Sequence, residues 1–553
     1  MPLDSAWNAY IFRDGKTAVS GPTLVRELAD RLLGFDSSPT KQTALIDLLL
    51  RAGELECALR DSDSPHAQSA EAITDTIAVS FVSKIALPAE GLARRLRPII
   101  APDQVQVAVP EGFAYYSLHP LDYVDLVRRA PQHSRHAAIV GIRSIGATLS
   151  AIVRAALRAD AIDAERITVR PSGHPYNRET RLSPAQQQWV ARMLSDGADF
   201  FVVDEGPGMS GSSFLSVGDA LISTGVPLSQ ITFLCSRQPD PASLTAANAA
   251  ERWPQFNACY TEPTRHLPRE AKHYVAGGIW RARAFPSENE WPSSWLQMER
   301  LKFLSADENR IFRFEGFGRF GGDVYDRATK VADAGFGPMP AAREAGFGVY
   351  PVLPGRYLSP ADATEEVILR LAEYCAFRAR HITSQVSQTP ELETMLRFNI
   401  QQEFAVELPV QLAGLRIERP VIADGRTLPH KWIDSAGNIM KLDAATHGDD
   451  HFFPGPTDIA WDLAGVIVEW NLEAEAADFF LENYRRCSGD DPANRLPAYL
   501  LAYSIFRTAY CKMAAAASRG TPEYDRLLRD YHRYRQQAKA LLGVPAESTD
   551  QAA

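Results

Sequence analysis

The sequence predicts a multidomain protein that combines an α/β domain with an α+β domain. Between about residue 104 and residue 235, short apolar segments alternate with stretches of helical spacing, which is typical of a doubly wound, mainly parallel sheet. The residues before this region carry the apolar spacing of helices. After about residue 296, strand-like segments give way to long helical ones. A chain of 553 residues also exceeds what one hydrophobic core usually supports.

These changes of pattern set the expected domain boundaries. We expect a helical N-terminal accessory region, a parallel-sheet domain, a linker rich in Ser and Pro, a second domain with a helical C-terminal lobe, and a polar tail. The expected bounds are 1–88, 89–286, 287–295, 296–545 and 546–553, in that order. The accessory region carries no motif with recognisable chemistry, so packing is its expected role.

The composition excludes several classes of partner. The net charge of −10 gives no electrostatic reason to bind nucleic acid or an anionic membrane. No apolar run reaches the length of about 18 residues that a membrane span needs, and the N-terminus lacks the features of a signal peptide. Six cysteines without C-x-x-C spacing indicate reduced thiols. We therefore expect a cytoplasmic protein with small-molecule substrates; a homodimer is one option for its assembly.

The stretch 200–214, FFVVDEGPGMSGSSF, contains the strongest functional pattern. A short apolar strand ends in two carboxylates, Asp204 and Glu205, and a helical pattern follows the turn. Glycines, hydroxyls and a helix N-terminus together form a cradle for an anion, and carboxylates accept hydrogen bonds from hydroxyls or hold Mg²⁺. The predicted cradle residues are Gly206, Gly208, Ser210, Gly211, Ser212 and Ser213. The alternative is an ordinary strand-to-helix turn.

This stretch resembles the phosphoribosyl-diphosphate (PRPP) loop of type I phosphoribosyltransferases, through Asp204, Glu205, Ser210, Gly211 and Ser213, with a turn one residue longer than usual. The resemblance implies a doubly wound phosphoribosyltransferase fold with PRPP as co-substrate and Mg²⁺ as cofactor. The two acids would act on the ribose hydroxyls as catalytic residues, and the turn would bind the 5-phosphate. Purine-using members often carry a carboxylate in the turn, which this sequence lacks, so the acceptor stays open.

Two further loops follow predicted strands in the order that the same family has. The loop 141–148 resembles the diphosphate-contacting loop, and the resemblance makes Arg143 and Ser144 ligands of PRPP. The loop 169–182 stands where the family has a mobile catalytic loop. There the resemblance assigns Arg178 to catalysis and Arg170 and Arg181 to PRPP. The alternatives are an ordinary glycine turn and a solvated basic loop. The hood that selects the acceptor would lie within 90–125 or 255–285.

The region after residue 296 resembles aminoglycoside and choline kinase-like phosphotransferases. Arg313, or less favourably Lys302, stands where that family contacts phosphate and would bind ATP. The segment 421–432 resembles the catalytic loop, with Asp424 as the base and His430 or Lys431 replacing the usual Asn. Asp443 ends the following strand, 19 residues later (443 minus 424). A base and a metal-holding Asp are what phosphoryl transfer needs, so the resemblance assigns Asp443 and His430 to the metal.

A second register is offered by the segment 447–451, HGDDH, which also resembles the kinase catalytic loop. Its spacing to Asp458 is too short for a hairpin, so we treat it as an insertion that either binds a metal or forms a capped loop. The main hypothesis is therefore a fused enzyme that transfers phosphoribosyl from, or to, PRPP and carries an ATP-dependent phosphotransferase-like domain. The alternative is a non-catalytic PRPP or nucleotide sensor with a pseudokinase scaffold.

Overall fold

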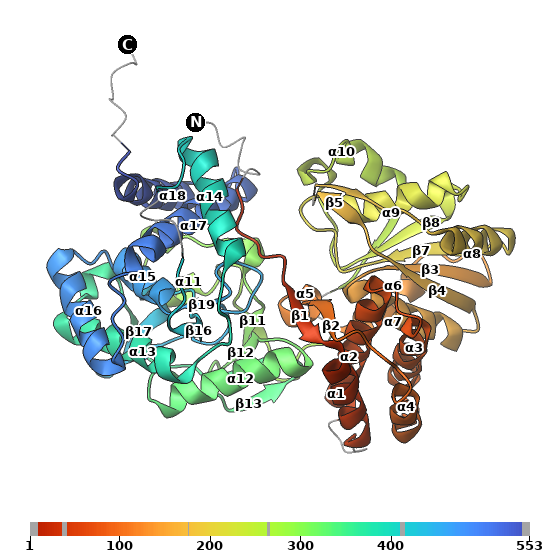
Figure 1. Cartoon of the computed structure of the whole chain (residues 1–553), viewed down its shortest axis with the longest axis horizontal. Helices are drawn as coiled ribbons and strands as arrows, with labels where there is room; N and C mark the ends of the chain where they lie inside the picture. The colour runs from red at the N-terminus through yellow and green to blue at the C-terminus, as the bar shows by residue number, and fades with distance from the viewer. Residues whose placement is uncertain (1–8, 36–40, 175, 263–265, 410–414, 545–553) are drawn as a thin grey trace, which may run out of the picture. The chain divides into compact units, whose positions relative to one another are not determined.

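The computed structural model describes residues 9–35, 41–174, 176–262, 266–409 and 415–544. Their contacts form two compact units, each described here by itself (Figure 1). Residues 15–268 with 316–321 form the parallel-sheet unit, and the other described residues form the antiparallel-sheet unit. The expected boundaries at 88 and 286 differ from this division. The N-terminal helices belong with the parallel sheet, and residues 269–286 belong with the second unit.

The parallel-sheet unit contains the predicted doubly wound sheet. Its strands are β3 (His136–Ile142), β4 (Asp163–Val169), β7 (Asp199–Val203), β8 (Ile231–Cys235) and β9 (Asn257–Tyr260). They are all parallel and lie in the order β4-β3-β7-β8-β9. The apolar runs of β7 and β8 are fully buried, as expected for strands covered on both faces. The predicted strand near residue 104 does not join them: β2 (Gln104–Ala108) pairs antiparallel with β1 (Lys16–Ser20).

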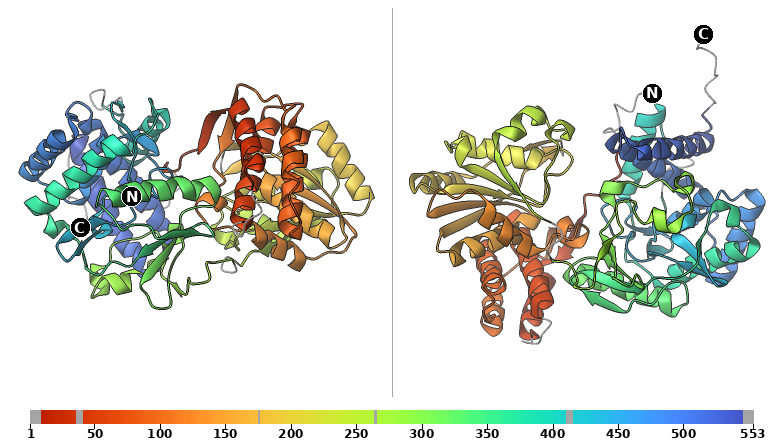
Figure 2. Two further views of the ribbon diagram at one scale, coloured as in Figure 1. Left: turned by 90° about the horizontal axis from the view of Figure 1, so that it is seen from below. Right: turned by 180° about the vertical axis from the view of Figure 1, so that it is seen from behind.

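Helices cover both faces of the parallel sheet. On one face, α8 (Pro184–Ser195) and α9 (Ser212–Ser223) share a core with alternate residues of β3, β7 and β8. On the other face, α7 (Ile145–Ala159) packs beside α6 (Pro120–Arg129). The N-terminal helices α2 (Lys41–Asp61) and α3 (Ala67–Ser83) pack on α7, with α1 (Gly21–Leu33) and α4 (Ala89–Leu96) beside them. Figure 2 shows this layering from two further sides.

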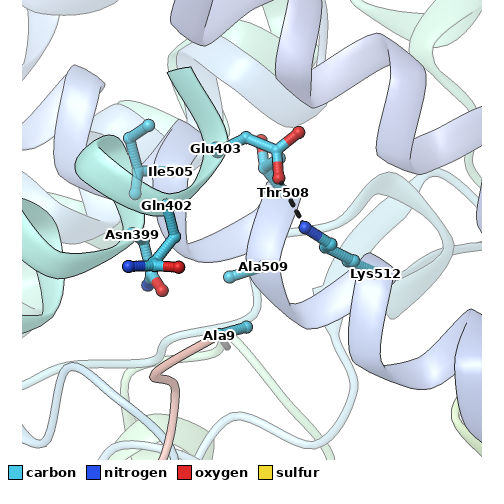
Figure 3. Close-up of a pocket in the computed structure, with 8 residues that line it drawn as sticks. All are labelled: Ala9, Asn399, Gln402, Glu403, Ile505, Thr508, Ala509 and Lys512. Atoms are coloured by element: carbon cyan, nitrogen blue, oxygen red, sulfur yellow. Dashed lines mark hydrogen bonds and ion pairs between the residues drawn. The ribbon is translucent and has the colours of Figure 1, made fainter. Parts of the chain in front are cut away.

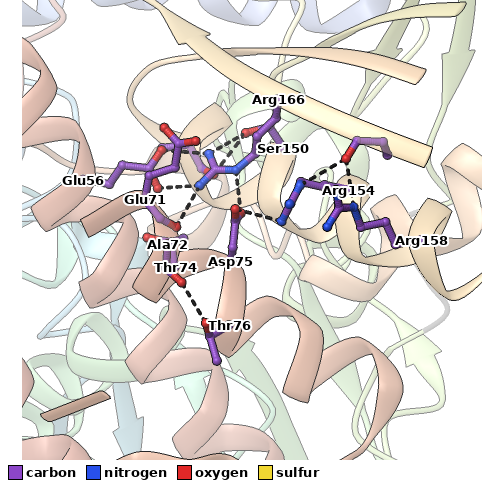
Figure 4. Close-up of polar contacts among 12 residues, drawn as sticks. Glu56, Glu71, Ala72, Thr74, Asp75, Thr76, Ser150, Arg154, Arg158 and Arg166 are labelled. Atoms are coloured by element: carbon purple, nitrogen blue, oxygen red, sulfur yellow. Dashed lines mark hydrogen bonds and ion pairs between the residues drawn. The ribbon is translucent and has the colours of Figure 1, made fainter. Parts of the chain in front are cut away.

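A buried charge network ties the N-terminal helices to the sheet (Figure 4). Arg166 of β4 is only 5 % exposed and donates to Glu56 Oε1 at 2.7 Å. Its Nε atom donates to Asp75 Oδ1 at 2.6 Å. Burial alone lowers the pKa of this guanidinium, but Glu56 and Asp75 raise it above its ordinary value. Because removing one partner of a buried ion pair is costly, this network fixes α2 and α3 on the sheet.

The antiparallel-sheet unit begins with a small sheet of β10 (His273–Tyr274), β11 (Lys302–Leu304), β12 (Arg310–Phe314), β13 (Ala342–Glu344) and β14 (Phe347–Pro351). The order is β10-β11-β12-β14-β13, with every pair antiparallel. The helix α12 (Gly318–Asp333) follows β12 and contributes its residues from Gly322 onward to this unit. Its core contact with Tyr350 of β14 is buried.

The remaining part of this unit is mostly helical. Its helices are α13 (Glu365–His381), α14 (Pro390–Phe404), α15 (Ala460–Glu469), α16 (Ala474–Ser488), α17 (Leu496–Ala517) and α18 (Pro522–Leu541). Between them lie β15 (Arg356–Tyr357), β16 (Pro420–Ile422), β17 (Trp432–Ser435), β18 (Asn438–Lys441) and β19 (Pro456–Asp458). A small antiparallel sheet followed by a helical lobe is the element order that the sequence predicted. No described helix is long and apolar enough to cross a membrane.

The segment predicted as a linker, 287–295, is packed against the rest of its unit. Ser294 N donates to Glu523 Oε1 of α18 at 2.7 Å, and Arg281 donates to the same carboxylate at 2.8 Å.

A small cavity between α14 and α17 lies beside the Glu403–Lys512 ion pair (Figure 3). Its volume of about 10 Å³ is enough for one water molecule and not for a substrate.

Candidate functional site

Three of the predicted loops start at one edge of the parallel sheet. Because β4, β3 and β7 are parallel neighbours, the segments after Val169, Ile142 and Val203 leave the sheet at the same end. This is the edge where doubly wound sheets bind their ligands. The topology therefore brings the loops around Arg170, Arg143 and Asp204 together, as the sequence order required.

Glycines allow these loops to approach one another closely. A Cβ atom at Gly146 would lie 2.8 Å from the carbonyl oxygen of Val203, and one at Gly141 would lie 2.3 Å from the carbonyl oxygen of Gly146. Gly211 has a φ of +69° immediately before α9, a conformation that favours glycine. Ser210 Oγ accepts from Ser212 N at 3.2 Å. The serine-rich turn thus ends at the N-terminus of α9, where backbone N–H groups favour an anion.

The acid pair Asp204 and Glu205 is held by backbone groups, and the nearby Arg170 favours the charge of Asp204 without forming an ion pair with it. Asp204 Oδ1 accepts from Glu205 N at 2.9 Å, and Glu205 Oε2 accepts from Gly112 N. Burial raises the pKa of Asp204 to about 7. Burial, with Glu111 and Asp204 nearby, raises the pKa of Glu205 well above its ordinary value. Among the described residues neither carboxylate makes an ion pair with Lys or Arg, so both fit the hydroxyls and the Mg²⁺ that the resemblance implies.

Two cations of the neighbouring loops are engaged by the N-terminal helix α2. Arg170 Nε donates to Asp61 Oδ1 at 3.2 Å, and its Nη1 atom donates to the carbonyl oxygen of Arg143 at 2.6 Å. The same Nη1 lies 3.3 Å from Ser144 Oγ. Arg143 itself forms an ion pair with Asp61 at 3.3 Å. The structure therefore places Arg143, Ser144 and Arg170 together, with Asp61 as a member that the sequence pattern did not reveal.

Arg178 and Arg181 lie apart from the acid pair. They belong to the hairpin of β5 (Ser172–His174) and β6 (Asn177–Glu179) and the turn after it. Arg178 Nη1 donates to the carbonyl oxygen of Gly173 at 2.5 Å, and Arg181 pairs with Glu179 at 3.2 Å. Both arginines line an open groove of about 570 Å³ against α9. This ligand-free arrangement does not bring either guanidinium to Asp204.

In the antiparallel-sheet unit, Asp424 does not have the surroundings that a catalytic base needs. Its side chain is 1 % exposed and lies 3.2 Å from the fully buried Lys441 Nζ. Tyr374 donates a hydrogen bond to the same carboxylate. The backbone N–H groups of Asp424 and Gly425 are held by Asp462 at 2.8 and 3.0 Å. Asp424 therefore forms a buried pair with Lys441, and its assignment as the base stays a prediction.

Asp443 is also surrounded by partners, and they are mostly cationic. Arg313 Nη1 lies 3.3 Å from it, Lys431 Nζ 3.6 Å and His447 Nε2 3.2 Å. Burial acts to raise the pKa of Asp443, but His447 and Arg313 hold it well below its ordinary range. Burial and the nearby Lys302 lower the pKa of Lys431 to about 7. The charged Arg313, together with Lys431 and His447, whose pKa values are both lowered, occupies the surroundings of this carboxylate, so the arrangement does not fit Mg²⁺.

The two predictions of metal ligation by histidine lack support in the geometry. His430 stacks on Trp280, with ring centroids 5.9 Å apart, instead of joining Asp443. In the segment 447–451, Asp449 pairs with Arg327 at 2.7 Å and His451 stacks on Phe12. No group of three or more His, Cys, Asp or Glu side chains in the described parts of the chain is arranged to hold a metal. The segment 447–451 is thus a paired loop.

Sequence reasoning missed the contribution of α2. Gly53, Cys57 and Asp61 recur every four residues along one face of this helix, and all three meet the loop or the start of α7. A Cβ atom at Gly53 would lie 2.0 Å from Thr148 Oγ1, and Cys57 Sγ donates to the carbonyl oxygen of Ser144 at 3.1 Å. The available signal was the four-residue spacing of Gly53, Cys57 and Asp61 along one stripe of the helix.

Comparisons with known proteins add a weak likeness of fold. No family model matches the sequence, and a search of curated proteins finds no match. Among solved structures, the choline kinase LicA from Streptococcus pneumoniae aligns with 14% identity, 44% of this chain, 90% of its own and a TM-score of 0.33. A choline/ethanolamine kinase family protein from Mesorhizobium loti aligns with 17% identity over 47% of this chain and 98% of its own, with a TM-score of 0.31. The GDP complex of aminoglycoside 2'-phosphotransferase-IIIa aligns with 13% identity over 47% of this chain and 96% of its own, with a TM-score of 0.29. At these values the likeness assigns neither a family nor an activity.

Proposed function

We propose that the parallel-sheet unit binds PRPP and transfers its phosphoribosyl group to a small-molecule acceptor. The observation that carries this proposal is the acid pair Asp204 and Glu205, which makes no ion pair with Lys or Arg among the described residues and stands beside a glycine and serine turn at a helix N-terminus. A phosphate cradle alone has no use for two half-buried carboxylates. A ligand with both a phosphate and vicinal hydroxyls uses every part of the arrangement.

Each part of PRPP would have its own binding residues at this edge of the sheet. The turn from Ser210 and the first N–H groups of α9 would bind the 5-phosphate. Asp204 and Glu205 would accept hydrogen bonds from the ribose hydroxyls and stabilise positive charge that develops at the ribosyl C1 atom. The loop 143–144 would face the diphosphate. When bound, Mg²⁺ would neutralise part of the diphosphate charge, with the acid pair as its protein-side partner. Arg178 would complete the site only if its hairpin moves.

An assay of Mg²⁺-dependent diphosphate release from PRPP, run across a panel of bases and amines, tests the proposal. We expect turnover with at least one acceptor and its loss in Asp204→Ala with Glu205→Ala. Turnover that survives in the double variant would contradict the proposal. Calorimetric binding of PRPP without turnover on any acceptor would favour the sensor alternative instead.

A second candidate function, an ATP-dependent small-molecule phosphotransferase, concerns the antiparallel-sheet unit. The observation that favours it is the pair of Arg313 and Asp443, 3.3 Å apart, which joins a strand of the small sheet to the end of β18. The buried Asp424–Lys441 pair opposes it. Equilibrium dialysis with ATP tests the point: binding that Arg313→Ala abolishes and Arg310→Ala leaves intact would support a nucleotide site. Arg310 is the matched control because it lies three residues earlier in β12 and is more exposed.

A further inference from the structure

We propose that Asp61 of α2 is a positioning residue of the diphosphate loop and that Arg170 acts through this loop without itself binding the ligand. The N-terminal helix would then be part of the site and not a separate accessory region. This inference rests on the proposed function for its ligand, and on the contacts of the ligand-free protein for its geometry.

The N–H donors of Arg170 are directed at acceptors of the protein. Nε and Nη2 form a fork on the two oxygens of Asp61, and Nη1 donates to the carbonyl oxygen of Arg143 and to Ser144 Oγ. Each nitrogen of the guanidinium therefore has a protein acceptor. A planar guanidinium held in this way has a fixed orientation. Four of its five N–H groups are used in this way, so Arg170 could offer diphosphate one N–H of Nη2 and could bind it with its fork only by giving up Asp61 or the loop.

Arg170 and Cys57 hold the backbone just before α7. Its bond to the carbonyl oxygen of Arg143, together with the bond from Cys57 Sγ to the carbonyl oxygen of Ser144, fixes two consecutive carbonyls on the side of α2. Both groups lie immediately before α7, which begins at Ile145. Holding these carbonyls by α2 and Arg170 sets the orientation of the peptide groups that open α7, where an anion would bind.

Asp61 lies against two arginines. Burial and the neighbouring Arg170 lower the pKa of Arg143, whereas Asp61 raises it. Asp61 is 3.3 Å from Arg143 and bonded to Arg170, so one carboxylate offsets both cations. Without it, two adjacent guanidinium groups would repel one another and the loop would lose its anchor.

Contacts with α7 and β4 hold the helix α2 itself in place. Gly53 permits α2 to touch Thr148 of α7, and the Arg166 network fixes α2 through Glu56. The space left between α2, β2 and the loop is only about 20 Å³, which is the size of a single water molecule. A movement of α2 would therefore be transmitted to Ser144 and Thr148.

A double-mutant cycle with diphosphate as the probe tests this inference. We expect Asp61→Ala and Arg170→Ala each to weaken diphosphate binding by about tenfold, because a displaced binding loop costs that order of affinity. The double variant should be no more than about threefold weaker than either single one, because both changes remove the same interaction. Asp61→Glu should restore most of the affinity. Asp160→Ala, which breaks an exposed ion pair with Arg128, is the control and should change nothing.

Hydrogen exchange of the loop amides in the ligand-free protein gives a readout that does not depend on PRPP. We expect the peptide 141–150 to exchange faster in Asp61→Ala and at the ordinary rate in Asp160→Ala; unchanged exchange in Asp61→Ala would overturn the inference. Tighter diphosphate binding in Asp61→Ala with lost binding in Arg170→Ala would also overturn it, because Arg170 would then be a ligand, while the proposed function would stand. If the intact protein bound neither PRPP nor diphosphate, the proposed function would fail and the exchange data alone would decide the role of Asp61.

Discussion

The two units each contain carboxylates close to the end of a β-strand, but the surroundings of these carboxylates are opposite. Asp204 and Glu205 have backbone donors and no ion pair among the described residues, and burial raises the pKa of both. Asp443 has Arg313, Lys431 and His447 within 3.6 Å, and its pKa is held well below the ordinary range. Poorly solvated carboxyl groups without an ion pair cost stability, so a site that retains them is a candidate for ligand binding. Buried charge with several partners needs no ligand.

The largest effect that this comparison predicts is on the acid pair. Asp204→Asn with Glu205→Gln should lower diphosphate release from PRPP by at least about 100-fold, because hydroxyl acceptors and charge stabilisation are both lost. The same variant should unfold at a higher denaturant concentration than the intact protein, since the cost of ionising two poorly solvated carboxyl groups is removed. The control is Asp196→Asn, which changes an exposed carboxylate beside Arg192. A destabilised double variant would contradict this view of the pair.

Asp443→Asn should have the reverse effect. Removing the common partner of Arg313, Lys431 and His447 should lower the free energy of unfolding of its unit by about 3 kcal/mol. PRPP turnover should stay within about twofold, because the phosphoribosyl site lies in the other unit. Chemical denaturation followed by tryptophan fluorescence and the diphosphate assay check the two parts. An unaltered stability would mean that the cations around Asp443 do not depend on its charge.

The two carboxylates should also give pH dependences of opposite sign. The pKa of Asp204 is raised from 3.8 to about 7 in the folded state. Its contribution to the free energy of unfolding therefore falls as the pH rises from about 4 to 7, by at most about 1.4 kcal/mol per pH unit. Asp443 has a lowered pKa, so its contribution is present above about pH 4 and is lost as the pH falls further. Unfolding curves of the intact protein, Asp204→Asn and Asp443→Asn between pH 3 and pH 8 separate the two slopes.

The smallest expected effect concerns metal in the antiparallel-sheet unit. Because His430 stacks on Trp280 and Asp443 is already neutralised, millimolar Mg²⁺ should shift the unfolding of this unit by less than about 0.5 kcal/mol. His430→Gln should not change that shift. A clear stabilisation by Mg²⁺ that is lost in His430→Gln would restore the predicted metal ligand.

Patterns local in sequence predicted the parallel sheet, its buried strands and the turn before α9 well, because apolar strands and glycine turns are encoded by adjacent residues. The pattern could not assign Asp61 to the site, because its contact with Arg170 spans 109 residues and depends on how α2 packs on α7. The surroundings of Asp424 lay beyond the pattern for a similar reason. Its spacing to Asp443 matched a kinase pattern, but its burial depends on Lys441 and Tyr374, which only the folded chain brings to it.

The same limit explains the division into units. The change in composition near 287–295 is real, but the hydrogen bonds of Ser293 and Ser294 to α18 make that segment part of a packed unit. Likewise the strand near residue 104 was correctly placed as a strand and incorrectly assigned to the parallel sheet. Pairing partners of strands are decided by tertiary packing, and β1 lies about 90 residues earlier in the chain.

The central claim is that the acid pair at the end of β7 binds the ribose of PRPP. Isothermal titration of PRPP with Mg²⁺ into the intact protein, Asp204→Asn with Glu205→Gln, and Asp443→Asn tests it most directly. The account predicts binding by the intact protein and by Asp443→Asn. Near pH 7 this binding should release protons, because a bound cation or hydroxyl lowers the pKa of Asp204, and buffers with different ionisation enthalpies would reveal it. It predicts no binding by the acid-pair variant. Equal binding by all three proteins would contradict it.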